Sequence, residues 1–364
     1  MNMQKSQKIS SGVKKELMKE FKGKRILVTG GTGSIGSTIV RGLLKYQPRQ
    51  IRVFSRDETK QFELAHKIGF PAPVNFLIGD VRDKERLNMA MENIDIVFHT
   101  AALKHVPACE KNPFEAVKTN VQGAQNVIKC AFANNVDKVI AISTDKATDP
   151  SGVMGCTKLL AEKLILASFL YKGDKRTKFC CVRFGNVLGS RGSVVPLFLD
   201  QLKQGKPITI TDPNMTRFFM SISQAVDLVF KATKLMKNRE IFVLKMPVMT
   251  IKDLAQAVRE IFEEKNRVKT EGVVKTIGKK WGEKIHEKLL TAEESLGALE
   301  TGEMFIVLPS LLDPESEYGF FDNTAYSGAK KSKVGEYSSE KAKKMSVKEI
   351  KKMLLSNDDL KFDL

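Results

Sequence analysis

The feature that most constrains the fold is a glycine-rich turn that joins a short apolar run to a helical pattern. The run RILVT ends at Thr29 and is followed by GGTGSIG. In a dinucleotide-binding unit the first glycine permits a tight turn, the second lets backbone N–H groups approach a pyrophosphate, and the third lets the helix pack on the strand. The predicted cofactor contacts in this turn are Gly30, Thr32, Gly33, Ser34, Ile35 and Gly36.

Short apolar runs recur along the chain and alternate with segments of helical period. Such runs are VNFLIGD, DIVFHTAA, KVIAIST and KFCCVRF, and TKLLAEKLILASFLYKG is one of the helical segments. Alternating strands and helices predict a parallel sheet, and runs that are apolar throughout suit strands covered by helices on both faces. We therefore expect an α/β fold of Rossmann type, in which a doubly wound parallel sheet carries the glycine turn.

The end of the second predicted strand, IRVFSR, indicates which dinucleotide is bound. An acidic residue about 20 residues after the glycines binds the ribose hydroxyls of NAD, whereas a cation accommodates the 2′-phosphate of NADP. Arg56, with Ser55 and Lys60, predicts NADP rather than NAD, although Asp57 and Glu58 follow at once. The alternative is that Arg56 is an ordinary surface cation.

The next two strand ends and one helix supply further predicted cofactor contacts. The run VNFLIGD ends near the adenine, and HTAALK would run past the nicotinamide ribose, where two small alanines allow close approach. Asn120, in KTNVQG, would lie on a helix beside the following strand, or else face solvent. The predicted contacts from these segments are Asp80, Val81, Ala101, Ala102, Lys104 and Asn120.

Composition excludes some classes of protein. No apolar run approaches the roughly 18 residues that span a bilayer, and the N-terminus has no apolar core, so we expect neither membrane insertion nor a signal peptide. The five cysteines show no metal-clip spacing and the histidines show no HExxH pairing. We therefore expect no metal and a reducing, cytoplasmic location.

The net charge of +18 is concentrated partly at the two ends of the chain. Residues 1–25 hold eight Lys or Arg against two Glu, and residues 330–352 hold nine Lys against three Glu, which gives +6 for each. These stretches lack interleaved aromatic residues, so we expect a solvated basic face and no nucleic-acid partner. The segment VKKELMKEF is expected to form a short amphipathic helix that packs on the body.

Several motifs in a fixed order carry a family resemblance. They are TGGTGSIG, HTAALKHVP, KTNVQG, STDKA and VMGCTK. With them the chain resembles the extended short-chain dehydrogenase/reductases and, among these, the UDP-N-acetylglucosamine 4,6-dehydratases of the capsule and polysaccharide-biosynthesis type. VRFGNVLGSRGSVVPLF and ITDPNMTRFFMSI match that family's nucleotide-sugar-binding segments. The tail GEYSSEKAKKMSVKEIKKMLL resembles the C-terminal latch of the members that invert C5.

The resemblance implies a domain plan and partners. We expect an N-terminal arm and NADP-binding Rossmann domain over 1–186, to which 218–248 returns. A smaller, interleaved nucleotide-sugar-binding domain would comprise 187–217 and 249–326, and a basic tail or latch would comprise 327–364. The implied partners are UDP-N-acetylglucosamine and further copies of the chain, in a hexamer or a dimer.

The reaction that the resemblance implies has three stages. A hydride leaves C4 of the sugar for the nicotinamide, the C5 proton and the 6-hydroxyl are then lost, and the hydride returns to C6 while a proton returns to C5. The product, a UDP-4-keto-6-deoxy-N-acetylhexosamine, would serve surface polysaccharide or glycan synthesis. A C5-retaining dehydratase, an epimerase on the same fold and an NADP-binding sensor stay open as alternatives.

The segment STDKATDPSGVMGCTK carries the predicted chemistry. Asp145 and Lys146 follow a central strand, and an acid beside an amine suits an acid–base pair. We expect Asp145 to protonate the leaving 6-hydroxyl, Lys146 to remove the C5 proton and Thr144 to bind O4. Lys158 would hold the nicotinamide ribose. Reductases of this superfamily have tyrosine where Met154 stands, so the C4 hydroxyl proton would go to Asp145 or to water, and Met154 would pack against the sugar or nicotinamide.

Residues further along the chain are expected to bind the nucleotide sugar. Asn186 would meet the sugar or its diphosphate, and Arg191 and Arg217 suit the diphosphate because a guanidinium fork matches phosphate oxygens. The alternative for each arginine is an ion pair at the surface or at an interface. The predicted substrate-binding residues are Lys104, His105, Asn186, Arg191, Val195 and Arg217.

Overall fold

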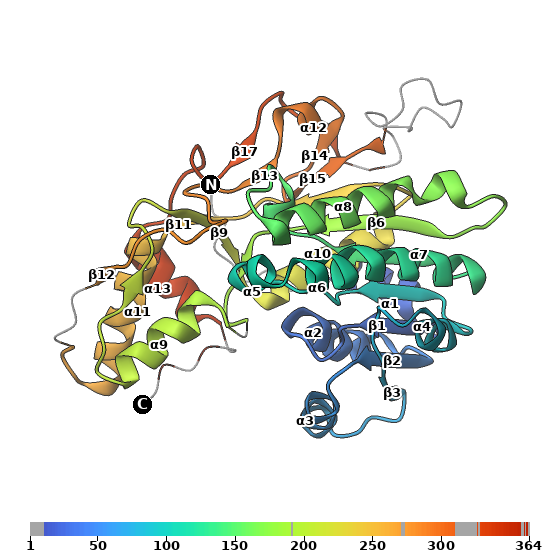
Figure 1. Cartoon of the computed structure of the whole chain (residues 1–364), viewed down its shortest axis with the longest axis horizontal. Helices are drawn as coiled ribbons and strands as arrows, with labels where there is room; N and C mark the ends of the chain where they lie inside the picture. Colours follow the sequence, from blue (N-terminus) through green and yellow to red (C-terminus); the bar gives the residue numbers. More distant parts are fainter. Residues whose placement is uncertain are drawn as a thin grey trace.

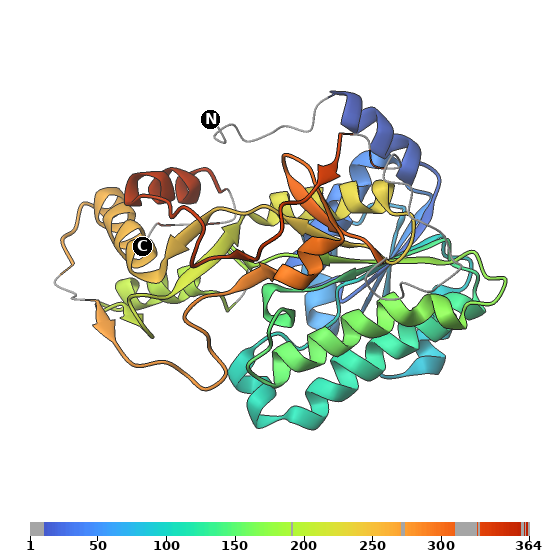
Figure 2. The ribbon, with the colours of Figure 1, turned by 90° about the horizontal axis from the view of Figure 1, so that it is seen from above.

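The protein has a large domain built on one twisted sheet and a smaller domain beside it, and the last part of the chain runs between the two (Figure 1 and Figure 2). Arg191, one of the two predicted diphosphate-binding arginines, lies outside the described residues, as do parts of the predicted tail. The computed structural model describes residues 11–190, 192–270, 274–309, 328–357 and the single residues 326, 360 and 362.

The large domain confirms the predicted Rossmann-type sheet. Among the described residues its strand order is β16-β14-β15-β10-β6-β5-β4-β1-β2-β3, and the strands from β10 to β3 run parallel. The order reverses between β1 and β4, which is where open α/β sheets bind ligands. The strands are β1 Arg25–Thr29, β2 Gln50–Ser55, β3 Val74–Ile78, β4 Ile96–His99, β5 Lys138–Ile142, β6 Lys178–Arg183, β10 Ile241–Leu244, β14 Ala298–Glu300, β15 Met304–Val307 and β16 Lys330–Lys331.

Helices cover both faces of this sheet (Figure 2). Helices α4, α7 and α8 pack together on one face, and α1, α2 and α10 pack together on the other. Phe21 of α1 is fully buried, with its ring 5.1 Å from that of Phe230 in α10, so the N-terminal helix packs on the body as predicted. The helices are α1 Ser11–Phe21, α2 Ser34–Leu43, α3 Glu58–Ile68, α4 Lys84–Met91, α5 Val106–Lys111, α6 Pro113–Ala116, α7 Gly123–Ala133, α8 Val153–Ala167, α10 Ile222–Leu235 and α12 Ala292–Leu296.

The smaller domain has an apolar core of its own. A three-stranded sheet of order β11-β9-β7 lies beside α9, α11 and α13, and both α9 and α13 pack against α11. Val195, Leu254 and Leu354 are among the side chains that fill this core. The elements are β7 Asn186–Val187, α9 Val194–Lys203, β8 Thr209–Ile210, β9 Thr216–Met220, β11 Val248–Thr250, α11 Ile251–Asn266, β12 Lys275–Thr276 and α13 Val347–Leu355.

The observed domains differ from the predicted boundaries in two places. The segment 298–307, expected in the nucleotide-sugar domain, forms β14 and β15 and extends the large sheet, where Phe242 of β10 pairs with Ile306. The C-terminal region is not a separate tail, because β17 Tyr337–Ser338 pairs with β13 Lys288–Leu290 and α13 completes the core of the smaller domain. Burial of apolar side chains against distant elements decides both placements, and no local sequence pattern reports it.

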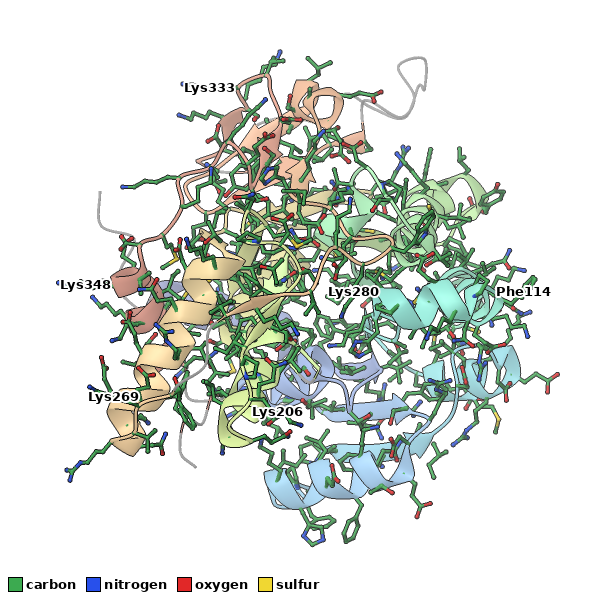
Figure 3. All side chains as sticks on the ribbon, turned by 60° about the vertical axis from the view of Figure 1, so that its left-hand side comes forward. Phe114, Lys206, Lys269, Lys280, Lys333 and Lys348 are labelled. Carbon is green, nitrogen blue, oxygen red and sulfur yellow. The ribbon has the colours of Figure 1, made fainter. Side chains whose placement is uncertain are left out.

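Positive charge projects from both domains (Figure 3). The labelled lysines Lys206, Lys269, Lys280, Lys333 and Lys348 extend from separate segments of the chain. They come from loops and from α13 rather than from one recognition helix or one groove. This arrangement fits the solvated basic face that the sequence predicts.

Candidate active site

The glycine turn lies between β1 and α2, at the end of the sheet where the strand order reverses. Gly30 has a φ of +66°, and a Cβ at this position would lie 2.7 Å from the Ala101 backbone. A Cβ on Gly36 would lie 2.5 Å from the Gly30 carbonyl oxygen. Gly33 is the N-cap residue of α2, and it has no side chain that could accept a hydrogen bond from the first N–H groups of the helix. The turn therefore brings bare backbone and the positive end of a helix to one place, which is the cradle that a dinucleotide pyrophosphate requires. The remaining predicted turn residues, Thr32, Ser34 and Ile35, lie in this cradle or in the first turn of α2.

The residues predicted to select NADP lie together at the ends of β2 and β3. Arg56 has 54% of its side chain exposed, and its Nη1 lies 3.5 Å from Asp80 Oδ2. Arg82 binds the same carboxylate at 2.7 Å. Burial would raise the pKa of Asp80, but the hydrogen bonds from Arg82 lower it below its ordinary value. Lys60 pairs with Asp57, the N-cap of α3, so the acid that follows Arg56 caps a helix.

Two further predicted cofactor residues have partners inside the fold. Ser55 accepts a hydrogen bond at its Oγ from Gln61 Nε2 at 3.0 Å. Val81 is buried beneath α7, where a Cβ on Gly123 would lie 2.8 Å from its side chain. Both residues therefore make structural contacts within the fold, in addition to the cofactor contacts predicted for them.

Asn120 faces the protein interior, so the solvent-facing alternative is wrong. It is 2% exposed and lies in a π-helical turn, Val117–Gln122, between α6 and α7. Its Oδ1 accepts from Leu103 N at 2.8 Å, and its Nδ2 donates to Leu103 O and to Thr157 Oγ1 at 3.1 and 3.0 Å. Asn120 thus ties the segment that carries Ala102 and Lys104 to helix α8.

The predicted acid–amine pair lies directly after the central strand β5. Asp145 is fully buried, and its Oδ1 lies 2.9 Å from Lys146 Nζ. The hydroxyl of Thr144 donates to the same Asp145 oxygen at 3.0 Å. Asp145 Oδ2 has no hydrogen-bond partner among the described residues. A buried carboxylate with one unpaired oxygen beside an amine is equipped to bind and move a proton.

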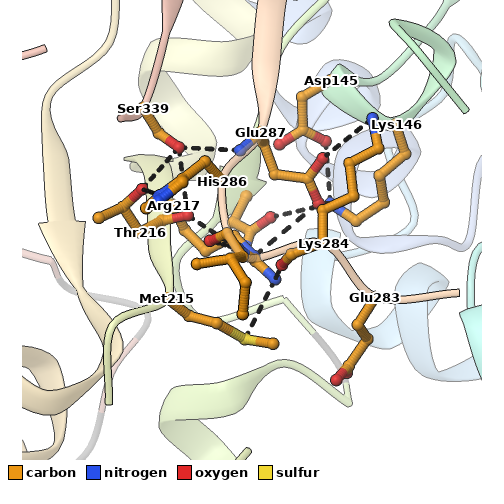
Figure 4. Close-up of polar contacts among 12 residues, drawn as sticks. Asp145, Lys146, Met215, Thr216, Arg217, Glu283, Lys284, His286, Glu287 and Ser339 are labelled. Carbon is orange, nitrogen blue, oxygen red and sulfur yellow. Dashed lines mark hydrogen bonds and ion pairs between the residues drawn. The ribbon is translucent and has the colours of Figure 1, made fainter. Parts of the chain in front are cut away.

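Lys146 is also held from the smaller domain. Asn186 Oδ1 lies 3.4 Å from its Nζ, and Glu287 Oε1 lies at the same distance on another side (Figure 4). Burial would lower the pKa of Lys146, but Asp145 and Glu287 together raise it above its ordinary value. The amine therefore lies between the carboxylate of the adjacent Asp145 and that of Glu287, which is distant in the sequence.

Glu287 and Lys284 are site residues that the sequence analysis missed. Both come from the segment that enters β13, and Lys284 Nζ donates to Thr148 O at 2.8 Å. The letters KIHE carry no spacing typical of catalysis, and only the fold brings them to β5. The available signal was one basic and one acidic residue three positions apart, which is too common a pattern to single out.

Met154 lies on α8 beside this cluster. It is 4% exposed, and a Cβ on the adjacent Gly155 would lie 2.5 Å from Lys146 O, so the helix packs tightly on the turn that carries Asp145 and Lys146. Lys158, one helical turn on, donates from Nζ to Ile142 O at 2.7 Å, and burial lowers its pKa. The pocket at this place is lined by Val106, Lys146, Ser151, Gly152, Met154, Gly155, Gly282, Lys284 and Glu287.

The other predicted substrate residues have different environments. Arg217 lies in the site, but its guanidinium donates to the carbonyl oxygens of Thr216, Lys284 and Ile285 at 2.7 to 2.9 Å. It therefore holds the Lys284–Glu287 segment in place. Val195 is fully buried in the core of the smaller domain, so it does not line the site as expected. The apolar face of α9, on which Val195 lies, packs against α11 instead.

His105 and Lys104 lie at the start of α5. His105 is the N-cap of that helix, and a Cβ on Gly192 would lie 2.8 Å from its ring. Burial and the neighbouring charge of Lys104 lower the pKa of His105. The structure thus brings His105 to Gly192, in the loop that precedes α9.

A doubly wound sheet with a GxxGxxG cradle, an acid–amine pair after the central strand and an interleaved second domain define an enzyme of the extended short-chain dehydrogenase/reductase superfamily. The chain belongs to the polysaccharide biosynthesis protein family, whose model matches residues 26–309.

Individual relatives differ in the names they carry. The chain is 51% identical to an uncharacterized membrane protein of Methanocaldococcus jannaschii, over 92% of this chain and 96% of that protein. It is 45% identical to the inverting UDP-N-acetylglucosamine 4,6-dehydratase of Campylobacter jejuni, over 82% and 87%. It is 41% identical to a protein of Rickettsia bellii named UDP-glucose 4-epimerase, over 94% and 99%.

A solved structure shares the whole architecture. The X-ray structure of Pen from Bacillus thuringiensis is 44% identical, matches with a TM-score of 0.85, and is covered over 93% of this chain and 99% of that one. Across the part of our chain that the structure describes, none of the helices combines the length and the apolar character needed to cross a bilayer.

The cradle generates a prediction about Gly30. Gly30→Ala should destabilise the protein and abolish dinucleotide binding, because the new Cβ meets the Ala101 backbone. Gly69→Ala is the matched control, since Gly69 has a φ of +74° but nothing within 4 Å of its Cβ position. The control should lose only about 1–2 kcal/mol of unfolding free energy, from the left-handed backbone alone. Urea unfolding and calorimetric cofactor titration measure both effects, and equal losses in the two variants would contradict the steric argument.

Proposed function

We propose that this protein is an NADP-dependent 4,6-dehydratase of UDP-N-acetylglucosamine that inverts C5. The observation that carries the proposal is the pair Asp145 and Lys146, 2.9 Å apart, of which Lys146 lines a pocket where Met154 stands in place of a tyrosine. Reduction or epimerisation at C4 alone requires no second acid–base pair, whereas removal of a C5 proton and a 6-hydroxyl requires both a base and an acid. Relatives at 45% identity carry the dehydratase name.

In this proposal the dinucleotide lies in the Gly30 cradle, with its 2′-phosphate near Arg56 and its nicotinamide ribose near Lys158. The cradle fits the group, because its Cβ-free backbone leaves room that any larger residue would fill. When bound, the nicotinamide supplies the acceptor and the donor of hydride. The protein holds the dinucleotide by backbone N–H groups and cations, and it leaves the proton chemistry to the turn after β5.

The proton movements follow from the positions of the two side chains. Asp145 takes the C4 hydroxyl proton on its carboxylate and later gives a proton to the departing 6-hydroxyl, which leaves as water. Lys146, as the free amine, takes the C5 proton and later releases it to solvent, while water gives a proton to C5 on the other face. Thr144 orients Asp145 through its 3.0 Å hydrogen bond. Over one cycle each side chain ends in its starting protonation state.

A second candidate function, epimerisation of a UDP-hexose, is favoured by the printed names of the Rickettsia relatives. It would use the same cradle and the same sugar position. It would leave Asp145 and Lys146 without a 6-hydroxyl to expel, so we rank it second. The cytoplasmic location and the homo-oligomer expected from the sequence stay predictions.

The reaction itself is the first test. Incubation of the purified protein with UDP-N-acetylglucosamine and a small amount of NADP should give a product lighter by one water, without net accumulation of reduced cofactor. NMR should identify a 4-keto-6-deoxy sugar with inverted C5. UDP-glucose, run in parallel, tests the second candidate. A product of unchanged mass with a new C4 configuration would contradict dehydration, and a product with retained C5 would contradict inversion alone.

Cofactor choice is a separate prediction. Arg56→Asp should weaken NADP binding by roughly ten- to hundredfold, because a charge-assisted hydrogen bond contributes about 1.5–3 kcal/mol. NAD binding should weaken less or improve. Lys67→Asp, which changes the charge equally on the exposed face of α3, is the control and should leave the ratio unchanged. Calorimetric titration with both cofactors checks this, and wild-type protein that binds NAD as tightly as NADP would refute the assignment.

A further inference from the structure

Glu287 is a buried carboxylate with an unusual set of neighbours. Only 3% of its side chain is exposed, and its Oε1 lies 3.4 Å from Lys146 Nζ and 3.9 Å from Arg217 Nε. Its Oε2 lies 4.0 Å from Lys284 Nζ and has no hydrogen-bond partner among the described residues. Figure 4 shows the Glu287 carboxylate beside the Lys146 amine.

The backbone of Glu287 is held by shorter polar contacts than its carboxylate. Its N–H donates to Ser339 Oγ at 2.9 Å, and its carbonyl accepts from Ser339 N at 2.8 Å. Thr216 Oγ1 donates to the same serine hydroxyl at 2.8 Å. Strand pairing between β13 and β17 therefore aims the side chain into the pocket, and this aim depends on the C-terminal region (Figure 4).

The contacts of the Glu287 carboxylate contribute little to the stability of the fold and suit a functional role. A buried carboxylate stabilises a fold when every oxygen is closely hydrogen-bonded, and an unsatisfied one costs about 1–3 kcal/mol. Glu287 makes its charge contacts at 3.4 Å or longer and leaves one oxygen unpaired on the pocket wall. The negative charge of Glu287 at this position therefore acts electrostatically on the other ionisable groups that line the pocket.

We propose that Glu287 is a positioning residue of the dehydration. It holds the ammonium form of Lys146 beside Asp145, and so controls when that amine is free to take the C5 proton. This inference rests on the proposed function and adds to it a residue that lies outside every motif of the sequence analysis.

The charged groups that face Lys146 determine the direction of the effect. Asp145 and Glu287 are negative, whereas Arg217 and Lys284 are positive. Burial lowers the pKa of Lys146, and the two carboxylates raise it by more. Removing one carboxylate leaves burial and Arg217 opposed by Asp145 alone, so the pKa falls. The free amine, which is the form that acts as a base, then appears at lower pH.

The test measures Lys146 itself and requires no turnover. The full-length protein is labelled with a trace of acetic anhydride, which reacts with free amines, at a series of pH values, and peptide mass spectrometry reports the labelling of Lys146. In Glu287→Gln, labelling at a given pH below the midpoint should increase at least about threefold, which corresponds to half a pH unit. Glu283→Gln is the matched control, because Glu283 lies on the same segment with its carboxylate directed away from Lys146 (Figure 4). It should leave the midpoint unchanged.

A second variant and a second readout complete the test. Glu287→Asp withdraws the carboxylate by one methylene and should shift the midpoint in the same direction by less, which keeps the inference testable if Glu287→Gln does not fold. In turnover assays with UDP-N-acetylglucosamine, the acid limb of kcat should move to lower pH in parallel. An unmoved midpoint in every folded Glu287 variant overturns the inference. Failure of the wild-type protein to dehydrate the substrate contradicts the proposed function instead, so the two failures are distinguishable.

Discussion

The placement of one partly buried ammonium group organises this protein. Lys146 follows the central strand of the large sheet, yet one of the two carboxylates that hold it, Glu287, comes from the segment that enters β13. Because a charge inside a protein is costly unless it is paired, the two domains and the C-terminal region must close around this group together. Arg217 contributes by holding the backbone on which Glu287 lies.

A second buried ion network stabilises the segment that follows β5. Arg183 of β6 is 1% exposed and pairs with Glu162 of α8 and with Glu294 of α12. Glu162 also accepts a hydrogen bond from Ser143, the residue that precedes the turn Thr144–Lys146, at 2.5 Å. Burial would lower the pKa of Arg183, but the two carboxylates keep it far above its ordinary range. The turn that carries Asp145 is therefore fixed on both sides by charge as well as by packing.

Local patterns in the sequence were sufficient for the elements of the cofactor half and insufficient for the site as a whole. The glycine turn, the strand ends at Arg56 and Asp80 and the Asp145–Lys146 turn follow from motifs whose meaning is local, and in the structure each lies just after a parallel strand of the large sheet. Asn120 was located but its burial was not, because a polar residue on a helix does not reveal which side is covered.

The residues that the sequence could not predict share one property. Glu287 reaches the site by a long-range register between β13 and β17, and Val195 leaves it because its helix face is needed in the core. The run MFIV at 304–307 could form a strand in either domain. It joins the large sheet because it pairs with the edge of β10. Long-range pairing of this kind depends on the whole fold rather than on any window of residues.

The account's central claim is that Lys146 and Asp145 divide the proton chemistry, and deuterium exchange in D₂O tests it most directly. In Lys146→Ala, exchange at C5 of UDP-N-acetylglucosamine and loss of water should fall together, by a factor of about 10² to 10⁴ for a lost general base. In Asp145→Asn, oxidation at C4 should fall as well, because the C4 hydroxyl loses its proton acceptor, whereas Lys146→Ala should still form reduced cofactor. A Lys146→Ala enzyme that dehydrates the substrate at a near wild-type rate would contradict the account, because C5 deprotonation would then require another base.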